Sequence, residues 1–273
     1  MSTYDQAIAR CSLPRLEARM LMEHASDRSR TWLIAHGDET VPAAQLARFN
    51  HLVGRRQAGE PMAYLLGSRE FRGLRIGVNP AVLIPRPETE CLVEAALARS
   101  PMGCHIIDLG TGSGAIALAM AHARPDLHIT ATDQSPQALA QAQANAKVLG
   151  LHRQISWRLG SWWAAVPSDQ RFDLVLSNPP YIAALDPHLV QGDLRFEPRE
   201  ALVGGPDGLA DLRAIVAGAA ARLKHDGWIL LEHGFDQAAA VRQLLSAAGF
   251  DPVCTLSDLA GLDRVSLGRH NRP

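Results

Sequence analysis

The chain carries Asp108-Leu109-Gly110-Thr111-Gly112-Ser113-Gly114 at the point that decides its fold. The residues before it, from Cys104 to Leu109, have the composition of a buried strand, and an alanine-rich helix is expected over Gly114–Ala123. Glycines between a strand and a helix permit a tight turn and let the backbone approach a ligand at the helix N-terminus. The stretch therefore predicts the first strand of a ligand-binding α/β sheet.

Downstream of this stretch the pattern alternates between strands and helices. Further strands are expected at residues 127–132, 154–159, 172–176, 228–232, 252–256 and 264–267. Helices are expected at residues 136–149, 209–223 and 237–248. Such alternation predicts a doubly wound, mostly parallel sheet of seven strands with helices on both faces.

Upstream of the sheet the pattern is different. The first 60 or so residues have apolar residues at helical spacing, and residues 69–78, with Gly73 in the middle, predict a β-hairpin. Pro80, Pro85 and Pro87 then indicate an extended connection. We therefore expect a small helical domain with a hairpin linker over residues 1–80 and a catalytic domain over residues 81–273.

Composition excludes several classes of protein. The formal net charge is −1, whereas a protein that grips phosphate backbone usually has a basic excess. No apolar run approaches membrane-spanning length. The four cysteines lie far apart without a CxxC pair, which indicates reduced thiols and a cytoplasmic protein, and the eleven histidines show no metal-ligand spacing. We therefore expect no membrane partner, no direct nucleic-acid substrate and no metal.

Asp133 ends the second strand of the expected sheet. A carboxylate at this place can accept hydrogen bonds from both ribose hydroxyls, so Asp133 and the glycine stretch together favour a nucleoside ligand. Two other interpretations remain open at this point. Gly110-x-Gly112-x-x-Ala115 also fits the relaxed dinucleotide fingerprint of NAD enzymes, and Asp133 alone can be a helix N-cap.

Two tryptophans, Trp162 and Trp163, follow the third expected strand. An adenine ring would lie near this strand end, so one of the two indole rings can stack on the base. Hydrophobic packing explains either tryptophan equally well.

The segment Asn178-Pro179-Pro180-Tyr181 follows the fourth strand, at the edge where open α/β sheets bind ligands. Two prolines stiffen the segment, so the Asn178 oxygen and the Pro179 carbonyl can both accept from one NH2 group. Tyr181 offers a flat face on which a planar amide or a base can stack. The arrangement predicts methylation of a planar, amide-type nitrogen, because an amide lone pair is delocalised and needs such positioning. A rigid turn without a ligand is the structural alternative.

The glycine stretch, Asp133 and the Asn-Pro-Pro-Tyr segment form a combination that resembles the motifs of the amino-methyltransferase branch of the class I S-adenosylmethionine enzymes. A second match is longer and resembles the HemK/PrmC family of glutamine N5-methyltransferases, which act on peptide chain release factors. It comprises Tyr64–Gly67, Glu70-Phe71, Gly73-Leu74, Val82–Glu90, Phe196–Pro198, Ala201-Leu202, Gly205–Leu209 and Leu231–Gly234.

The resemblance implies a class I methyltransferase fold and S-adenosyl-L-methionine as cofactor. It implies that the methionine moiety lies beside Gly110, Thr111, Gly112, Ser113 and Gly114, the ribose on Asp133, and the adenine near Trp162. It places the reactive amide on Asn178, Pro179, Pro180 and Tyr181, with Asn178 also beside the cofactor. The implied substrate is the glutamine of the Gly-Gly-Gln loop in bacterial-type release factors.

Several points stay open at the level of sequence. Many members of the family have an acidic residue where this chain has Ser161, which weakens the expected contact with adenine. An N6-adenine or other exocyclic-amino nucleic-acid methyltransferase shares the Asn-Pro-Pro-Tyr segment, and a non-catalytic nucleotide-binding adaptor is a third possibility. Ligand contact and structural support are alternatives for a set of charged residues: Arg86, Glu88, Glu90, Glu197 and Glu232.

Overall fold

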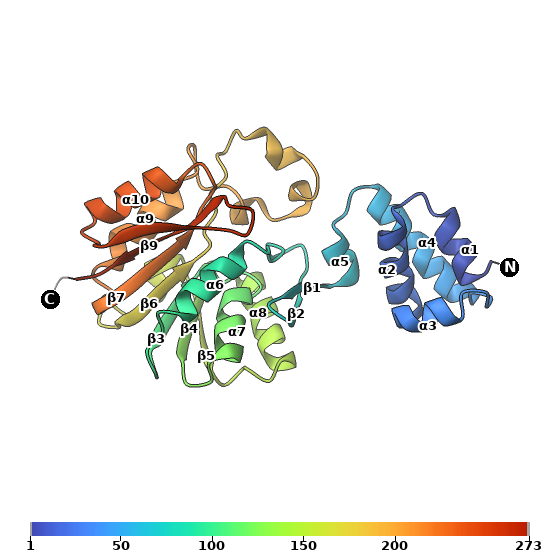
Figure 1. Cartoon of the computed structure of the whole chain (residues 1–273), viewed down its shortest axis with the longest axis horizontal. Coiled ribbons are helices and arrows are strands. Elements are labelled where there is room, and N and C mark those ends of the chain that lie inside the picture. The colour runs from blue at the N-terminus through green and yellow to red at the C-terminus, as the bar shows by residue number, and fades with distance from the viewer. Residues whose placement is uncertain (1, 272–273) are drawn as a thin grey trace. The chain divides into compact units, whose positions relative to one another are not determined.

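A computed structural model describes residues 2–271 of the chain (Figure 1). Its contacts divide the chain into two compact units, Met1–Ser68 and Arg69–Pro273. The first unit is helical, and the second contains the sheet. None of the helices within residues 2–271 combines the length and the apolar character needed to cross a membrane.

The first unit consists of α1 (Tyr4–Arg10), α2 (Arg15–Ser26), α3 (Arg30–Ala35), α4 (Ala43–Gln57) and α5 (Met62–Leu66). Its core forms where the apolar stripes of these helices meet, with Leu21 and Met22 of α2 beside Phe49 and Leu52 of α4. These side chains recur at helical spacing, which gives each helix one apolar face to bury. The expected helical N-terminal region is thereby confirmed.

The second unit contains the seven-stranded sheet that the alternating pattern predicts. The strands are β3 (His105–Leu109), β4 (His128–Asp133), β5 (Ile155–Leu159), β6 (Phe172–Ser177), β7 (Leu223–Glu232), β8 (Val253–Ser257) and β9 (Asp263–Arg269). Their order is β5-β4-β3-β6-β7-β9-β8, and β9 alone runs antiparallel to its neighbours β7 and β8. The order reverses between β3 and β6, which is where doubly wound sheets open a crevice for ligands.

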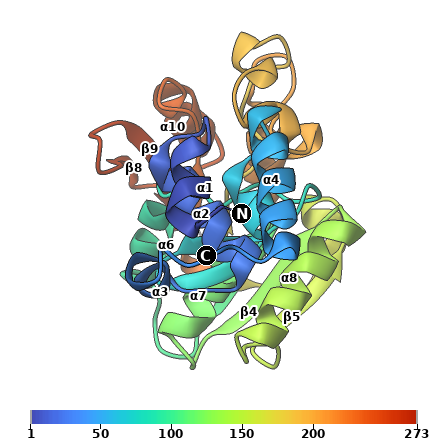
Figure 2. The same cartoon turned by 90° about the vertical axis from the view of Figure 1, so that its right-hand side faces the viewer.

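Helices cover both faces of this sheet (Figure 1). One face carries α6 (Thr89–Leu97), α7 (Ala115–Ala123) and α8 (Pro136–Val148), and the other carries α9 (Ala210–Ala219) and α10 (Ala238–Ala247). Figure 2 shows α8 alongside β4 and β5. The main core lies under α9 and α10, where Ile215 and Leu245 meet Val175 and Ile229 of the sheet.

Two elements differ from the expectation. The helix expected over residues 209–223 ends at Ala219, and β7 already begins at Leu223, where it pairs with Phe172 of β6. Because β7 begins this early, the first residue of β6 has a backbone partner: the Phe172 amide donates a hydrogen bond to the Arg222 carbonyl. The second difference is α6, which lies in a stretch for which the sequence predicts no element.

The hairpin is formed by β1 (Ser68–Phe71) and β2 (Leu74–Gly77). Its second strand is attached to α8, because the Asn145 amide exchanges hydrogen bonds with the backbone of Gly77 at 2.9 and 3.0 Å. The same amide nitrogen donates to the Ser113 carbonyl of the glycine stretch at 2.8 Å. The hairpin is therefore attached to the unit that contains the sheet, whereas the sequence groups it as a linker with the helical domain over residues 1–80.

A long excursion separates β6 from α9. It contains three short 3₁₀ helices, η2 (Pro187–Val190), η3 (Leu194–Phe196) and η4 (Arg199–Ala201), and Figure 1 shows it in gold, standing out beyond the end of β6. Another, η1 (Trp162–Ala165), follows β5. The excursion begins with the Asn-Pro-Pro-Tyr segment, so it lies at the sheet edge where the site was expected.

Candidate active site

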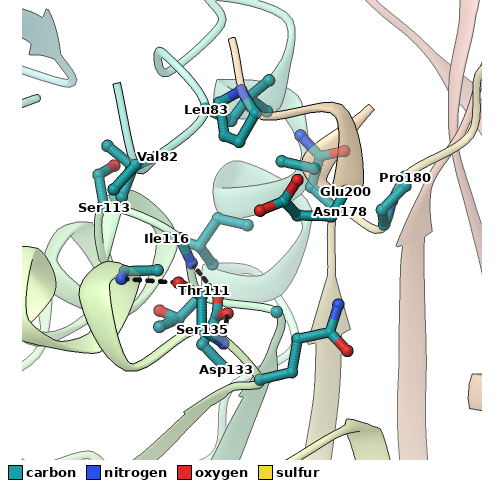
Figure 3. A pocket seen from close by; sticks show the side chains of 18 of the residues that line it. Val82, Leu83, Thr111, Ser113, Ile116, Asp133, Ser135, Asn178, Pro180 and Glu200 are labelled. Atoms are coloured by element: carbon teal, nitrogen blue, oxygen red, sulfur yellow. Dashed lines mark hydrogen bonds between the residues drawn. The ribbon is translucent and has the colours of Figure 1, made fainter. Parts of the chain in front are cut away.

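A large cavity opens at the carboxyl ends of β3, β4 and β6 (Figure 3). Its open space, including solvent at the mouth, is about 960 Å³. Most of the residues that the sequence suggested for ligand binding line it: Gly110, Thr111, Gly112, Ser113, Asp133, Trp162, Asn178 and Pro180. Pro179 and Tyr181 line a smaller neighbouring cavity instead, and Gly114 lies behind the loop against Leu118 and Ala142.

The glycine loop between β3 and α7 needs glycine at position 110 for two reasons. Gly110 has a φ of 72°, a left-handed conformation that residues with a Cβ rarely adopt. A Cβ on Gly110 would also stand 3.0 Å from the ring of Trp162. The backbone and the indole ring can therefore form neighbouring walls of the large cavity only because this residue has no side chain.

Asp133 stands at the end of β4 with both carboxylate oxygens engaged. They accept hydrogen bonds from the backbone amides of Gly112 at 2.8 Å and Ser135 at 2.9 Å. These contacts fix the carboxylate at the cavity wall, and each oxygen keeps a further lone pair for a ligand hydroxyl. Burial raises the pKa of Asp133, while hydrogen bonds from Ser135 and Gly112 oppose that effect.

Asp108 lies beneath the same loop and is fully buried. Its Oδ2 atom accepts from the Thr111 hydroxyl at 2.6 Å, whereas Oδ1 has no hydrogen-bond partner within residues 2–271. Burial raises the pKa of Asp108 to about 7. The side chain therefore holds Thr111 in place from below.

The two tryptophans after β5 have different surroundings. Trp162 lines the large cavity, and its Nε1 atom donates to Asp211 at 3.2 Å. Its φ of 43° is an unusual, strained conformation for a bulky residue, which the surrounding contacts must hold. Trp163 instead donates to the Ile215 carbonyl at 2.8 Å and packs against the core under α9. Of the two rings, Trp162 is the one placed to meet a ligand.

Asn178 is shared by two cavities. It lines the large one, and it also lines a smaller cavity of about 330 Å³ together with Pro179 and Tyr181. Leu83, Arg86 and Ala201 lie on both as well. The four residues of the Asn-Pro-Pro-Tyr segment thus stand where the two cavities meet.

The Pro180 and Tyr181 carbonyl groups of this segment pack closely against a later part of the excursion, residues 201–208. Gln237 Nε2 donates to the Tyr181 carbonyl at 2.9 Å. A Cβ on Gly208 would lie 2.2 Å from the same oxygen, and a Cβ on Gly204 would lie 2.3 Å from the Pro180 carbonyl. Glycines at these positions therefore let a second backbone segment support the first.

Arg86, which lines the large cavity, forms an ion pair with the buried Glu197. Glu197 also accepts from the Ile84 amide at 2.9 Å, so the carboxylate attaches the proline-rich connection to the excursion. Burial raises the pKa of Glu197, and the charge of Arg86 opposes this. These contacts fit a structural role for Glu197. Glu90 also fits such a role, because it accepts a hydrogen bond from the Arg72 amide at 3.2 Å. Arg86, in contrast, lines both cavities. Glu88 directly precedes α6.

Glu232 is the last residue of β7, His233 follows it, and both are fully buried. His233 contacts the Gly234 carbonyl and the Ser266 hydroxyl, each at 2.8 Å, and burial lowers its pKa. These bonds leave both ring nitrogens engaged, which fits a structural role and not that of a base. Burial raises the pKa of Glu232 to about 7.

Several residues of the site were not identified from the sequence. Thr89, Ile116, Ser135 and Glu200 line the large cavity, and Figure 3 shows the Glu200 side chain directed into it. Ser161 lines it too, at the position where the sequence departs from the family pattern. Ser135 was the easiest to find, since a serine directly before Pro136 is a strong N-cap signal and its hydroxyl does accept from the Ala138 amide.

Comparison with known proteins agrees with this geometry. The family model described as PrmC N-terminal domain matches residues 6–67, and the one described as methyltransferase small domain matches residues 87–194. The chain is similar to the methyltransferase of Pyrococcus furiosus in fold, with a TM-score of 0.57 at 16% identity over 80% of this chain and 98% of that one.

Two full-length relatives carry the same description, release factor glutamine methyltransferase. The protein of Bordetella pertussis is 52% identical over 98% of this chain and 99% of its own length. That of Neisseria gonorrhoeae is 50% identical over 98% of each chain. This chain therefore belongs to the release factor glutamine methyltransferase family.

Proposed function

We propose that the chain transfers a methyl group from S-adenosyl-L-methionine to the side-chain amide nitrogen (N5) of the glutamine in the Gly-Gly-Gln loop of bacterial-type peptide chain release factors. One observation carries the proposal: Asn178 lines both the large and the small cavity. A methyl donor in the first and an amide in the second would meet at this side chain.

The large cavity fits S-adenosylmethionine in the chemistry of its walls. Asp133 offers carboxylate lone pairs to two ribose hydroxyls, and Trp162 offers an aromatic face to adenine. The glycine loop allows close approach of the methionine moiety to the backbone of residues 110–113. When bound, the cofactor supplies a methyl group on a positively charged sulfur, an electrophile that a nitrogen lone pair can attack.

The residues of the Asn-Pro-Pro-Tyr segment act on the acceptor. The Asn178 oxygen and the Pro179 carbonyl accept the two hydrogens of the glutamine amide, which holds the nitrogen in line and favours the positive charge that develops on it. Tyr181 packs against the amide plane. The C–N bond forms as the C–S bond breaks, and the nitrogen then loses one proton to solvent. Alignment of this kind is worth roughly 7–11 kcal/mol of a barrier.

Labelled cofactor tests the proposal with purified release factor, either wild type or with the loop glutamine replaced by alanine. We expect label on the wild-type factor only. Equal labelling of the two factors would refute the assignment of the acceptor. Transfer to DNA or RNA with none to the factor would favour the nucleic-acid alternative, and cofactor binding without turnover on any acceptor would favour an adaptor.

We further propose that the helical unit docks the release factor. Leu16 and Ile34 of this unit are 62% and 65% exposed, so both side chains are accessible to a partner. The double variant Leu16→Glu/Ile34→Glu should raise the KM for the release factor and leave the cofactor Kd unchanged. An unchanged KM would argue against docking through these two side chains.

A further inference from the structure

A buried carboxyl group, that of Glu232, lies beside Asn178 of the Asn-Pro-Pro-Tyr segment. Ser177 of β6 pairs with Leu231 of β7 in parallel register, so the next residues along the two strands, Asn178 and Glu232, are neighbours. Glu232 is fully buried, yet neither carboxylate oxygen reaches hydrogen-bond geometry with any residue of the described part of the chain. A buried carboxyl group is costly, so its presence at this position calls for a role.

The third member of the cluster comes from α6. Asn178 Nδ2 donates to the Thr89 hydroxyl oxygen at 3.2 Å, and Thr89 is buried. The hydroxyl that accepts this bond has one hydrogen of its own to donate, and the carboxyl of Glu232 is the neighbouring acceptor. Burial raises the pKa of Glu232, while Thr89 and Asn178 both act to lower it, as expected for donors that point toward its oxygens.

We propose that Thr89 and Glu232 are positioning residues that hold the Asn178 carboxamide with its nitrogen turned inward and its oxygen turned toward the acceptor amide. A carboxamide can flip by half a turn at little cost, and the flipped form would present a donor to the donor of the substrate. While the threonine hydroxyl donates its hydrogen to the carboxyl, it can only accept from Asn178, which favours the orientation with the carboxamide nitrogen turned inward. The inference rests on the proposed function, because it assigns a task to Asn178.

The chemistry at position 232 must be that of an acceptor. Other polar and titratable groups that face Glu232 are Arg264 from β9, Glu88, Cys91 and Tyr181. Arg264 is a donor, and the acceptor of the Asn178 nitrogen is the Thr89 hydroxyl oxygen. Glutamine at this position would keep the volume of the side chain and replace one of its two acceptor oxygens by an NH2 donor.

Four single variants test the inference: Thr89→Val, Thr89→Ser, Glu232→Gln and, as a control on the same helix as Thr89, Glu94→Gln. Glu94 is exposed and pairs with Arg72, away from the cluster. We expect Thr89→Val and Glu232→Gln to lower kcat by about tenfold or more while the cofactor Kd stays within about threefold. Thr89→Ser retains the hydroxyl and should stay within about threefold of wild type, and Glu94→Gln should be unchanged.

A double-mutant cycle separates positioning from general structural support. If Thr89 acts through Asn178, adding Thr89→Val to Asn178→Ala should lower kcat by less than about twofold more. A full additional loss in the double variant would overturn the inference. So would a wild-type kcat in both Thr89→Val and Glu232→Gln, or a loss of thermal stability without a change in kcat.

The same measurements distinguish this inference from the proposed function. If Asn178→Ala turns over like wild type, the proposed function itself fails. If Asn178→Ala is impaired while Thr89→Val and Glu232→Gln are not, the function stands and only the positioning role is lost.

Discussion

Ser177 donates its hydroxyl hydrogen to the Leu109 carbonyl at 2.6 Å, and both groups are fully buried. Leu109 is the last residue before the glycine loop, and Ser177 is the last before the Asn-Pro-Pro-Tyr segment. The bond thus joins the ends of β3 and β6, after which the glycine loop and the Asn-Pro-Pro-Tyr segment begin. It fixes their spacing at the point where the sheet order reverses.

Replacing Ser177 by alanine should affect both cavities together. The substitution leaves a buried carbonyl without its side-chain donor, which costs about 1–3 kcal/mol in the free energy of unfolding. We also expect a weaker cofactor affinity and a lower kcat, because both loops start at this bond. Denaturant unfolding and steady-state kinetics measure these effects. Ser156→Ala on β5, where the side chain is exposed, is the control. An unchanged unfolding free energy would mean that the Ser177 hydroxyl does not contribute to stability.

Asp133→Asn should weaken cofactor binding and have little effect on the chemical step. Its carboxylate accepts two backbone amides and is proposed to accept two ribose hydroxyls, contacts that do not change during methyl transfer. Hydrogen bonds to a charged group are worth about 1.5–3 kcal/mol, so the cofactor Kd should rise by about 10- to 100-fold. Calorimetry gives the Kd, and kcat at saturating cofactor is the comparison. The exposed Asp169→Asn is the control, and a fall in kcat at constant Kd would contradict this division of roles.

Cofactor affinity should also depend on pH through Asp133. Burial raises the pKa of this carboxyl above the ordinary value of 3.8, so protonation begins at a higher pH than for an exposed aspartate. The protonated form has lost acceptor capacity, and the affinity should therefore decline as the pH falls through the raised pKa. Titration of the Kd against pH for wild type and Asp133→Asn checks this. The variant should lack the decline, and parallel curves would show that another group causes it.

Gly208→Ala should displace the Asn-Pro-Pro-Tyr segment. Gly208 has a φ of 73°, and a Cβ there would lie 2.2 Å from the Tyr181 carbonyl, so the added methyl group must displace that carbonyl. Gly150 offers a matched control, because its φ is 74° and a Cβ added there would meet nothing within 4 Å. Both variants carry the backbone strain of about 1 kcal/mol or more, but only Gly208→Ala should lower kcat. Equal kinetics in the two variants would mean that the close approach is unimportant.

The sheet and most of the cavity could be predicted from the sequence because their signals are local. A buried strand followed by glycines, an acid at the next strand end and a proline-stiffened loop each fall within a few residues. The parallel topology then brings their carboxyl ends to one edge. For the same reason Gly110, Asp133 and Asn178 could be predicted to lie at one site, and all three line the large cavity.

Thr89 shows what the sequence could not reveal. Its partner Asn178 is 89 positions away, so no local pattern connects them. The helix that carries it was missed because three prolines precede it, although Pro87 just before the apolar residues Leu92, Val93, Ala95 and Ala96 was an available helix-start signal. The attachment of the hairpin to Asn145 is also long-range, so no local pattern reveals it.

Glu232→Gln should change the pH dependence of stability independently of turnover. The pKa of Glu232 is about 7 in the folded chain against an ordinary value of 4.5, so the folded state holds this proton more tightly than the unfolded state does. Stability from this group is therefore fully present below 4.5 and is lost as the pH rises to about 7. A shift of this size corresponds to about 3 kcal/mol.

Glutamine does not titrate, so the variant lacks this loss. The difference in unfolding free energy between Glu232→Gln and wild type should move by about 3 kcal/mol in favour of the variant from acidic to mildly alkaline pH. Asp108, whose pKa is also raised to about 7, is present in both proteins and cancels from the difference. Denaturant unfolding across this range is the measurement, with Glu94→Gln as the control. A constant difference would show that Glu232 is already ionised in the folded chain, and Thr89 and Asn178 would then be its donors at every pH where the enzyme works.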